Sequence, residues 1–398
     1  MIVIQENRTV DNLFNGFPGA NTVNWGMRGS KKVALKEIAL ATKFDPCHKH
    51  NCFVDDYDGG AMDGFDLPNS CTKHCKATNT AYAYVAPKYT AGYWQIASQF
   101  ALADNVYQAN QGPSFPAHQY LIAGQSGRPL SIAENPPSIG GGCDQPQKDL
   151  TLTINTAQPY PYPEGAKVWA CLDYTTILDE LDTAHVTWKY YTPTDDLAWT
   201  APEGVYHLAN GPDAANIITP ETAFLKDAKA HSLPLVSYVA PRLSDSDHAG
   251  LDSNTGGPDW VGSIVNQIEG DSYYAGNTVV FVVWDDWGGW YDHMPPTIID
   301  AFEYGFRVPL LAVSPYVKQG VDDKPRRVVS LMAFLERLYG LPSLGMLDTG
   351  ADDLFGMFQW PLGAGKHAQH RHFTPIFTHG KTWRDYVDLP PDGSPVDD

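Results

Sequence analysis

Positive charge is scarce in this sequence. Of its 398 residues, 27 are Lys or Arg and 46 are Asp or Glu, so the formal net charge is −19 at pH 7. A field of this sign disfavours nucleic acid and anionic membrane surfaces as electrostatic partners. An anionic substrate would need a local cation to offset the same field.

Long apolar runs and a signal peptide are also missing. No stretch approaches the roughly 18 apolar residues of a membrane span, so we expect no such span and a soluble chain. The chain opens directly on a strand-like segment, MIVIQEN, and we expect that a leader has been lost in front of it. We find no internal repeat.

Cysteine is sparse, and no CxxC pair occurs. The six cysteines are Cys47, Cys52, Cys71, Cys75, Cys143 and Cys171. An even number in loop-like sequence favours disulfides and an oxidising compartment, so we expect a secreted or periplasmic protein. We expect the local pairs Cys47–Cys52, Cys71–Cys75 and Cys143–Cys171. The alternative is a structural zinc site made from CHKHNC (47–52) and CTKHC (71–75).

Strand and helix signals alternate along the chain, which indicates an α/β fold with a central, mostly parallel sheet and helices on both faces. The expected strands are Met1–Ile4, Val186–Tyr191, Leu233–Val239, Val279–Val283 and Val308–Val313. The expected helices are Ala91–Leu102, Phe115–Ala123, Thr222–Ala230, Trp260–Glu269 and Arg327–Leu338. With 43% hydrophobic residues, the chain has ample material for a large core.

We expect one α/β domain over residues 1–398. Two loop-rich stretches, 45–80 and 127–170, interrupt the alternation and read as insertions over the strand ends. The segment 349–398 is irregular, and its histidine cluster HAQHRH (367–372) is typical of a solvated loop rather than a ligand set.

The most informative segment is VVFVVWDDWGGWYDH, residues 279–293. Its β-branched start predicts a strand buried on both faces. Asp285 and Asp286 fall where this strand stops, at the end where α/β proteins bind ligands. Adjacent carboxylates raise each other's pKa unless a cation neutralises them, and no Lys or Arg follows nearby. A metal is the simplest neutraliser, and a solvated acidic turn is the alternative.

The first strand ends in Glu6-Asn7, with Asp11 soon after. If both strands are central, Glu6, Asn7, Asp285 and Asp286 can converge on one divalent ion. An all-oxygen ligand set favours Mg²⁺, Ca²⁺ or Mn²⁺, and a nearby histidine would allow Zn²⁺. Capping and turn formation are the alternative roles for Glu6 and Asn7.

Ser114, in NQGPSFPAHQYLIAGQSG, is the candidate nucleophile. Pro116 fits the first turn of a helix, which places Ser114 at the helix N-terminus, where backbone N–H groups and the dipole favour an anion. A metal can activate such a hydroxyl without a Ser–His pair. An ordinary N-cap is the commoner use of such a serine.

Histidines provide candidates for phosphate binding and proton transfer. His248 follows the expected strand Leu233–Val239, and His48 precedes the acidic run DDYDGGAMDGFD. His293, in YDHMPP, is an alternative proton donor. His118 and His207 are weak candidates.

These segments resemble the bacterial phosphoesterase family that joins phosphatidylcholine-type phospholipases C and AcpA-like acid phosphatases. The matching segments are IVIQENRTVDNLF, DPCHKH with DDYDGGAMDGF, GPSFPAHQYLIAG, WKYY, LPLVSYVAPRLSDSDH, WDDWGGWYDHMPP and VPLLAVSPYVKQG. The resemblance implies an alkaline-phosphatase-like fold. It also implies one metal on Glu6, Asn7, Asp285 and Asp286, with Ser114 as nucleophile and further ligand. His48 and His248 would contact the phosphate.

One departure stands out. Family members tend to carry Asp-His-Thr-Ser where this chain has Arg327-Val328-Val329-Ser330, so Val328 replaces the usual histidine. We predict a metal-dependent phosphoric ester hydrolase of the acid phosphatase kind, acting on a small phosphate ester through a phosphoserine. A phospholipase C-type diesterase acting on a lipid headgroup and a secreted binding protein with a degenerate site are the alternatives.

Overall fold

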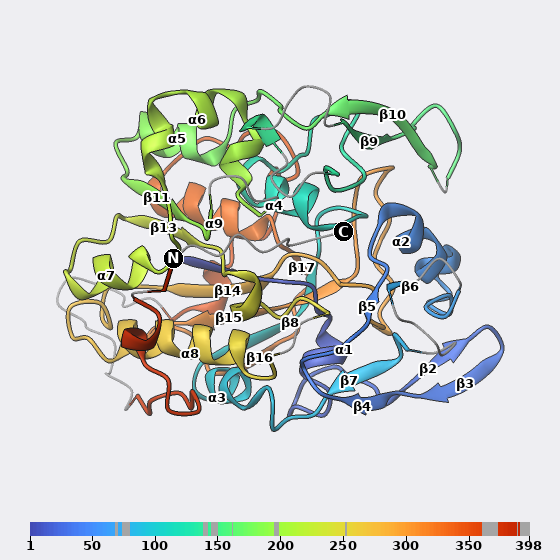
Figure 1. The fold of residues 1–398 in the computed structure, drawn as a ribbon, viewed down its shortest axis with the longest axis horizontal. Coiled ribbons are helices and arrows are strands. Elements are labelled where there is room, and N and C mark those ends of the chain that lie inside the picture. Colours follow the sequence, from blue (N-terminus) through green and yellow to red (C-terminus); the bar gives the residue numbers. More distant parts are fainter. Residues whose placement is uncertain are drawn as a thin grey trace.

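The computed structural model describes residues 1–67, 71–73, 80–137, 142–144, 150–160, 162–194, 199–250, 253–359, 373–387 and 389–390. At its centre lies one large sheet (Figure 1). In spatial order its strands are β12 (Ile217–Ile218), β11 (Trp188–Tyr191), β13 (Val236–Val239), β1 (Ile2–Gln5), β14 (Val280–Trp284), β15 (Arg307–Val313), β8 (Ala101–Tyr107) and β16 (Gly320–Asp322), and β17 (Arg326–Arg327) also pairs with β8.

The sheet is mostly parallel, as the alternating pattern predicts. β12, β11, β13, β1 and β14 all pair in parallel, whereas β15 runs antiparallel to both of its neighbours. β1 and β14 are buried at every position, which explains their continuous apolar sequence. The parallel strands therefore end together at one edge of the sheet, on the right in Figure 1.

Helices cover both faces of the sheet (Figure 1). α3, α7 and α8 lie together on one face, and α4, α5 and α9 lie together on the other. The helices are α1 (Val10–Leu13), α2 (His50–Tyr57), α3 (Ala91–Gln99), α4 (Ser114–Ala123), α5 (Ile177–Thr183), α6 (Tyr206–Asn210), α7 (Ala223–Lys229), α8 (Gly256–Glu269) and α9 (Ser330–Tyr339). None of these helices is both long and apolar enough to cross a bilayer.

Two of the expected helices are longer than the helices that the structure shows. The helix expected to reach Leu102 ends at Gln99, because Ala101–Tyr107 forms β8 against β15. The helix expected from Arg327 begins at Ser330, because Arg326–Arg327 pairs with β8. In both cases tertiary pairing overrides the local helical pattern.

Four small sheets lie outside the central one. They pair β2 (Trp25–Arg28) with β3 (Lys31–Ala34), β4 (Lys36–Ile38) with β7 (Ala83–Val85), β5 (Asp45–Pro46) with β6 (Cys71–Lys73), and β9 (Leu150–Ile154) with β10 (Glu164–Trp169). Two of these pairs fall in the loop-rich stretches 45–80 and 127–170.

Two of the expected disulfides are present, Cys47–Cys52 and Cys143–Cys171. The zinc alternative is therefore wrong for Cys47 and Cys52, because a disulfide sulfur offers no thiolate to a metal. The expected Cys71–Cys75 pair and the histidine cluster 367–372 lie outside the residues whose structure is described.

Candidate functional site

The carboxyl ends of β1 and β14 bring two acidic segments into register. Gln5 pairs with Trp284, so the next residues, Glu6 and Asp285, emerge side by side. The backbone N–H of Asp285 continues the pairing by donating to the Gln5 carbonyl at 3.1 Å. Both carboxylates are almost fully buried, at 0% and 1% exposed. Burial of two neighbouring carboxylates costs free energy unless a positive charge accompanies them.

Asn7 lies between these carboxylates in a left-handed backbone conformation, with φ of 57°. Its backbone N–H donates to Asp285 Oδ1 at 3.1 Å. Its side-chain oxygen lies 2.9 Å from Glu6 Oε2 and 3.2 Å from Asp285 Oδ1. Three acceptor oxygens at these distances need either the amide turned over, so that its nitrogen donates to the carboxylates, or a cation among them.

The second aspartate is held by a tight turn. Asp286 Oδ1 accepts the N–H of Gly288 at 2.7 Å, and Asp286 Oδ2 accepts the Ser114 hydroxyl at 3.0 Å. Gly288 has φ of +62°, and a Cβ there would lie 2.3 Å from the Asn7 carbonyl oxygen. A glycine is therefore required where the Asp286 turn passes the Asn7 backbone.

Ser114 is the first residue of α4, and its side chain does not cap that helix. Pro113 occupies the N-cap position, and the Phe115 N–H donates to the Asn135 side chain at 2.8 Å. The Ser114 hydroxyl contacts Asp286 and, at 3.4 Å, the side-chain oxygen of Asn7. The N-cap alternative is thus wrong, because the hydroxyl faces the acidic cluster instead.

Two histidines stand on the other side of Asn7. His48 Nε2 and His248 Nε2 both lie 3.2 Å from side-chain amide atoms of Asn7, and their rings meet edge to face at 5.6 Å. His48 Nδ1 contacts the Pro46 carbonyl at 3.0 Å, and His248 Nδ1 contacts the Ala249 carbonyl at 2.7 Å. A backbone carbonyl accepts only from an N–H, so each Nε2 is left to face the site.

His118 is the residue that sequence reasoning undervalued. It follows Ser114 by four positions in α4, so the two side chains share one helix face. His118 Nε2 lies 3.0 Å from Glu6 Oε1 and 3.7 Å from Asp285 Oδ2. The spacing was visible in the sequence, but an isolated histidine in an apolar helix is typical of a core residue.

The structure does not bring His293 into this group. His293 Nδ1 lies 2.6 Å from Asp11 Oδ2 and 3.4 Å from an Arg307 nitrogen. Arg307 also binds both oxygens of Asp292, at 2.8 and 3.0 Å. Arg307 thus supplies a positive charge to this second group of possible ligands, which comprises Asp11, Asp292 and His293. His207 lies elsewhere, between Asp173 and Asp179.

The residues at the strand ends fit a divalent metal. Glu6, His118 and Asp285 each offer a ligand atom, and these atoms lie within 4.8 Å of one another. Asp285 Oδ2 is buried and accepts no hydrogen bond from the described residues. Such an oxygen is expected where a cation completes the arrangement.

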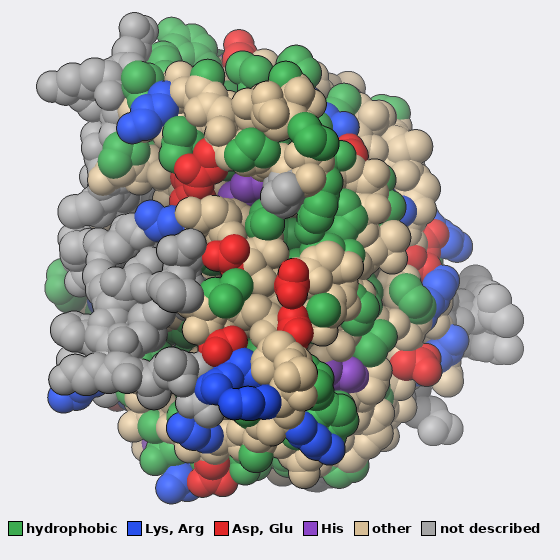
Figure 2. Space-filling view, turned by 90° about the vertical axis from the view of Figure 1, so that its right-hand side faces the viewer, with side chains coloured by type: hydrophobic (Ala, Val, Ile, Leu, Met, Phe, Trp, Pro, Cys, Tyr) green, Lys and Arg blue, Asp and Glu red, His purple; other side chains and the backbone are tan. Residues whose placement is uncertain are grey.

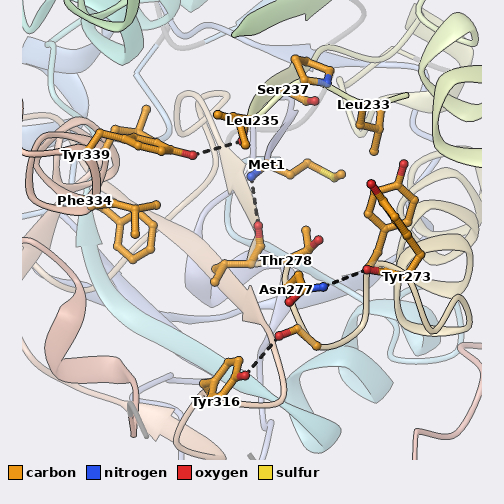
Figure 3. A pocket seen from close by; sticks show the side chains of 16 residues that line it. Met1, Leu233, Leu235, Ser237, Tyr273, Asn277, Thr278, Tyr316, Phe334 and Tyr339 are labelled. Atoms are coloured by element: carbon orange, nitrogen blue, oxygen red, sulfur yellow. Dashed lines mark hydrogen bonds between the residues drawn. The ribbon is translucent and has the colours of Figure 1, made fainter. Parts of the chain in front are cut away.

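A separate pocket of about 500 Å³ lies at the opposite edge of the sheet (Figure 3). Met1, Leu233 and Val279, which precede β1, β13 and β14, line it together with Tyr273 and other residues. It therefore opens at the amino ends of the strands, away from the acidic cluster. Figure 2 shows the face at which the strands end, where histidine contributes only small areas of surface. His48 and His248 are each only 5% exposed.

The chain is similar in sequence to a known protein family and to several named proteins. The model of the phosphoesterase family matches residues 1–342. The phosphate-repressible acid phosphatase of Penicillium chrysogenum is 27% identical over 215 residues, which are 47% of this chain and 49% of that protein. The non-hemolytic phospholipase C of Pseudomonas aeruginosa is 22% identical over 399 residues, which are 86% of this chain and 54% of that protein. The chain spans about half the length of these relatives.

Among solved structures, a protein in the alkaline phosphatase superfamily from Vibrio parahaemolyticus is similar at a TM-score of 0.37 and 13% identity. The match covers 78% of this chain and 71% of that one.

Proposed function

The chain belongs to the phosphoesterase family, and from this membership we propose that it hydrolyses phosphoric esters with Ser114 as the nucleophile. The observation that carries the proposal is the contact of the Ser114 hydroxyl with Asp286 at 3.0 Å, inside the cluster at the ends of β1 and β14. A buried serine with this environment has its hydroxyl beside a base and beside the place where a cation fits.

In the proposed first step, Ser114 Oγ forms a bond to phosphorus while the bond from phosphorus to the alcohol oxygen breaks. Asp286 Oδ2, which already accepts the hydroxyl hydrogen bond, takes the proton. His48 or His248, in its doubly protonated form, donates the proton on Nε2 to the departing oxygen, because the Nε2 atoms of both face the site. A divalent metal held by Glu6, Asn7, Ser114, Asp285 and Asp286 would neutralise charge on the phosphoryl oxygens.

In the second step, water attacks the phosphoserine. The same histidine takes a proton from the water, and the bond between phosphorus and Ser114 Oγ breaks. Asp286 returns a proton to Ser114, and phosphate leaves. Over one turnover, Asp286 and the histidine each return to their starting protonation states. Both groups that transfer protons already lie at the site.

Relatives are named both acid phosphatase and phospholipase C, so the ester class needs a direct test. The purified protein is assayed from acid to neutral pH with Mn²⁺, Ca²⁺ or Zn²⁺ on p-nitrophenyl phosphate and on p-nitrophenyl phosphorylcholine. We expect hydrolysis of the monoester. Hydrolysis of the diester instead would indicate a phospholipase C-type enzyme, and hydrolysis of neither would indicate a degenerate binding protein.

The metal has its own test. We expect a dialysed Asp285→Asn variant to retain far less metal than the unaltered protein, because the variant loses one buried carboxylate. Asp173→Asn, at an exposed surface position, is the matched control. Equal metal content in all three proteins would remove Asp285 from the proposed ligand set.

We also propose that the protein works outside the reducing cytosol. Two disulfides support this location, because such bonds persist mainly in oxidising compartments.

Val328, at the position of the usual family histidine, is buried in the core at 2% exposed. The proposed mechanism therefore assigns proton transfer to His48 and His248 and none to that position.

A further inference from the structure

His118 sits inside the acidic cluster with both ring nitrogens in defined contacts. Its side chain is fully buried, and it comes from the same face of α4 as Ser114. Nδ1 lies 3.3 Å from the Tyr190 hydroxyl, and Nε2 faces the carboxylates of Glu6 and Asp285. The position of the ring proton therefore decides what Nε2 can do.

Tyr190 fixes that proton. Its hydroxyl donates its single hydrogen to the Trp199 carbonyl at 2.7 Å, because a carbonyl cannot donate. Burial raises the pKa of Tyr190 well above its ordinary value, so the hydroxyl keeps this hydrogen. Toward His118 the tyrosine oxygen is then an acceptor for a hydrogen on Nδ1, which leaves Nε2 as the ring atom that can bind a cation.

His118 Nε2 lies beside two carboxylates. Glu6 Oε1 lies 3.0 Å away, and Asp285 Oδ2 lies 3.7 Å away. Asp285 Oδ2 is the buried oxygen that accepts no hydrogen bond from the described part of the chain. Two acceptor oxygens and one nitrogen lone pair directed at the same small volume are typical ligands of a cation.

We propose that His118 Nε2 is a nitrogen ligand of the divalent metal in the proposed hydrolytic site. This inference rests on the proposed function and adds to it. A nitrogen donor among carboxylates suits Zn²⁺, Co²⁺, Mn²⁺ or Fe²⁺ better than Mg²⁺ or Ca²⁺. The Tyr190 contact would hold the ring in its metal-binding tautomer, as an outer hydrogen bond commonly does for a ligating histidine.

The test uses the full chain stripped of metal with a chelator and reloaded with Mn²⁺. Pulsed electron paramagnetic resonance reads whether an imidazole ¹⁴N couples to the bound ion. Calorimetry measures affinity for Co²⁺, Zn²⁺ and Ca²⁺. The variants are His118→Asn and His118→Gln, with His207→Asn at the surface as the control.

We expect ¹⁴N coupling in the unaltered protein and in His207→Asn, and its loss in both His118 variants. Affinity for Co²⁺ and Zn²⁺ should fall at least about tenfold, and affinity for Ca²⁺ should change much less. Glutamine can still donate to Glu6 from the Nε2 position. Full recovery of transition-metal affinity in His118→Gln would therefore show that His118 only positions Glu6, which would overturn the inference.

Other outcomes separate this inference from the proposed function. Metal binding without ¹⁴N coupling, together with hydrolysis of p-nitrophenyl phosphate, would overturn the role of His118 and leave the hydrolase intact. Coupling that persists in His118→Asn would assign the nitrogen to another histidine. An unaltered protein that binds none of these metals would refute the metal-dependent mechanism and this inference together.

Discussion

The Ser114 hydroxyl and the Asp286 carboxylate lie 3.0 Å apart, although 172 positions separate the two residues in the chain. The contact joins the start of α4 to the end of β14. Everything proposed about catalysis depends on this junction, because it places a nucleophile beside the buried acidic cluster.

Ser114→Ala removes the proposed nucleophile. We expect turnover of p-nitrophenyl phosphate to fall by about 10³-fold or more, since no other hydroxyl can replace a covalent nucleophile. Thermal unfolding should change little. Ser98→Ala, which removes an exposed hydroxyl from α3, is the control. Near-normal turnover in Ser114→Ala would exclude the phosphoserine route.

Much of the central sheet is predictable from the sequence because its strands are buried on both faces. The runs at β1 and β14 are continuous and apolar, and tertiary structure agrees with that pattern. β8 is different, since ALADNVY carries few β-branched residues and follows a helix directly. Its strand conformation depends on pairing with β15, which no local pattern records.

The site residues also divide into those whose positions follow from the sequence and those whose positions do not. Glu6, Asn7, Asp285 and Asp286 could be predicted to converge because strand ends in a parallel sheet share one edge. His118 and His293 show where this reasoning stops. From the sequence His118 is only a weak candidate, although in the structure it faces Glu6, and the loop histidine near the aspartates turns instead to Asp11. Side-chain direction depends on packing between distant segments.

Gly288 provides a test of the Asp286 turn. Gly288→Ala would place a Cβ 2.3 Å from the Asn7 carbonyl oxygen in a left-handed conformation. We expect a loss of about 1–3 kcal/mol in the free energy of unfolding and a marked loss of metal affinity, because the Asn7 and Asp286 backbones must move apart. Chemical denaturation and calorimetry measure the two effects.

Gly356→Ala is the matched control for Gly288. Its added Cβ would meet no heavy atom of the described chain within 4 Å, and its φ is not in the left-handed range. We expect nearly unchanged stability and metal affinity. Equal effects of the two substitutions would contradict the special role of the Asp286 turn.

The Cys47–Cys52 disulfide brackets His48 and constrains a loop of the site. Replacing both cysteines by alanine should cost about 2 kcal/mol of stability, the value expected for a short closed loop. We also expect KM for p-nitrophenyl phosphate to rise several-fold, because His48 would be held less firmly beside Asn7. Steady-state kinetics at a temperature below unfolding measures this change.

The Cys143–Cys171 pair serves as the comparison for Cys47–Cys52, since its partners lie 28 positions apart and do not flank a candidate site histidine. Its double alanine variant should lose at least as much stability, because the closed loop is longer. KM should change less than in the Cys47/Cys52 variant. A similar rise in KM for both variants would attribute the effect to general loosening rather than to His48.

Glu269, at the end of α8, gives the fold a specific dependence on pH. Burial raises the pKa of Glu269 to about 7. Its Oε1 is buried and accepts no hydrogen bond from the described residues. The raised pKa means that the folded protein holds the proton more tightly than the unfolded chain. This stabilisation is complete below about pH 4.5, the unfolded value, and disappears as pH rises through about 7.

Glu269→Gln should remove this contribution, because the amide stays neutral at every pH. We expect the variant to gain up to about 3 kcal/mol relative to the unaltered protein at pH 8 and little at pH 4. Urea unfolding at a series of pH values measures the difference. Glu37→Gln, exposed on β4, is the control. Its free energy of unfolding should differ from that of the unaltered protein by the same amount at every pH. If the difference in free energy of unfolding between Glu269→Gln and the unaltered protein is also the same at every pH, the carboxyl ionises as readily in the folded protein as in the unfolded chain. Burial of Glu269 then costs no stability.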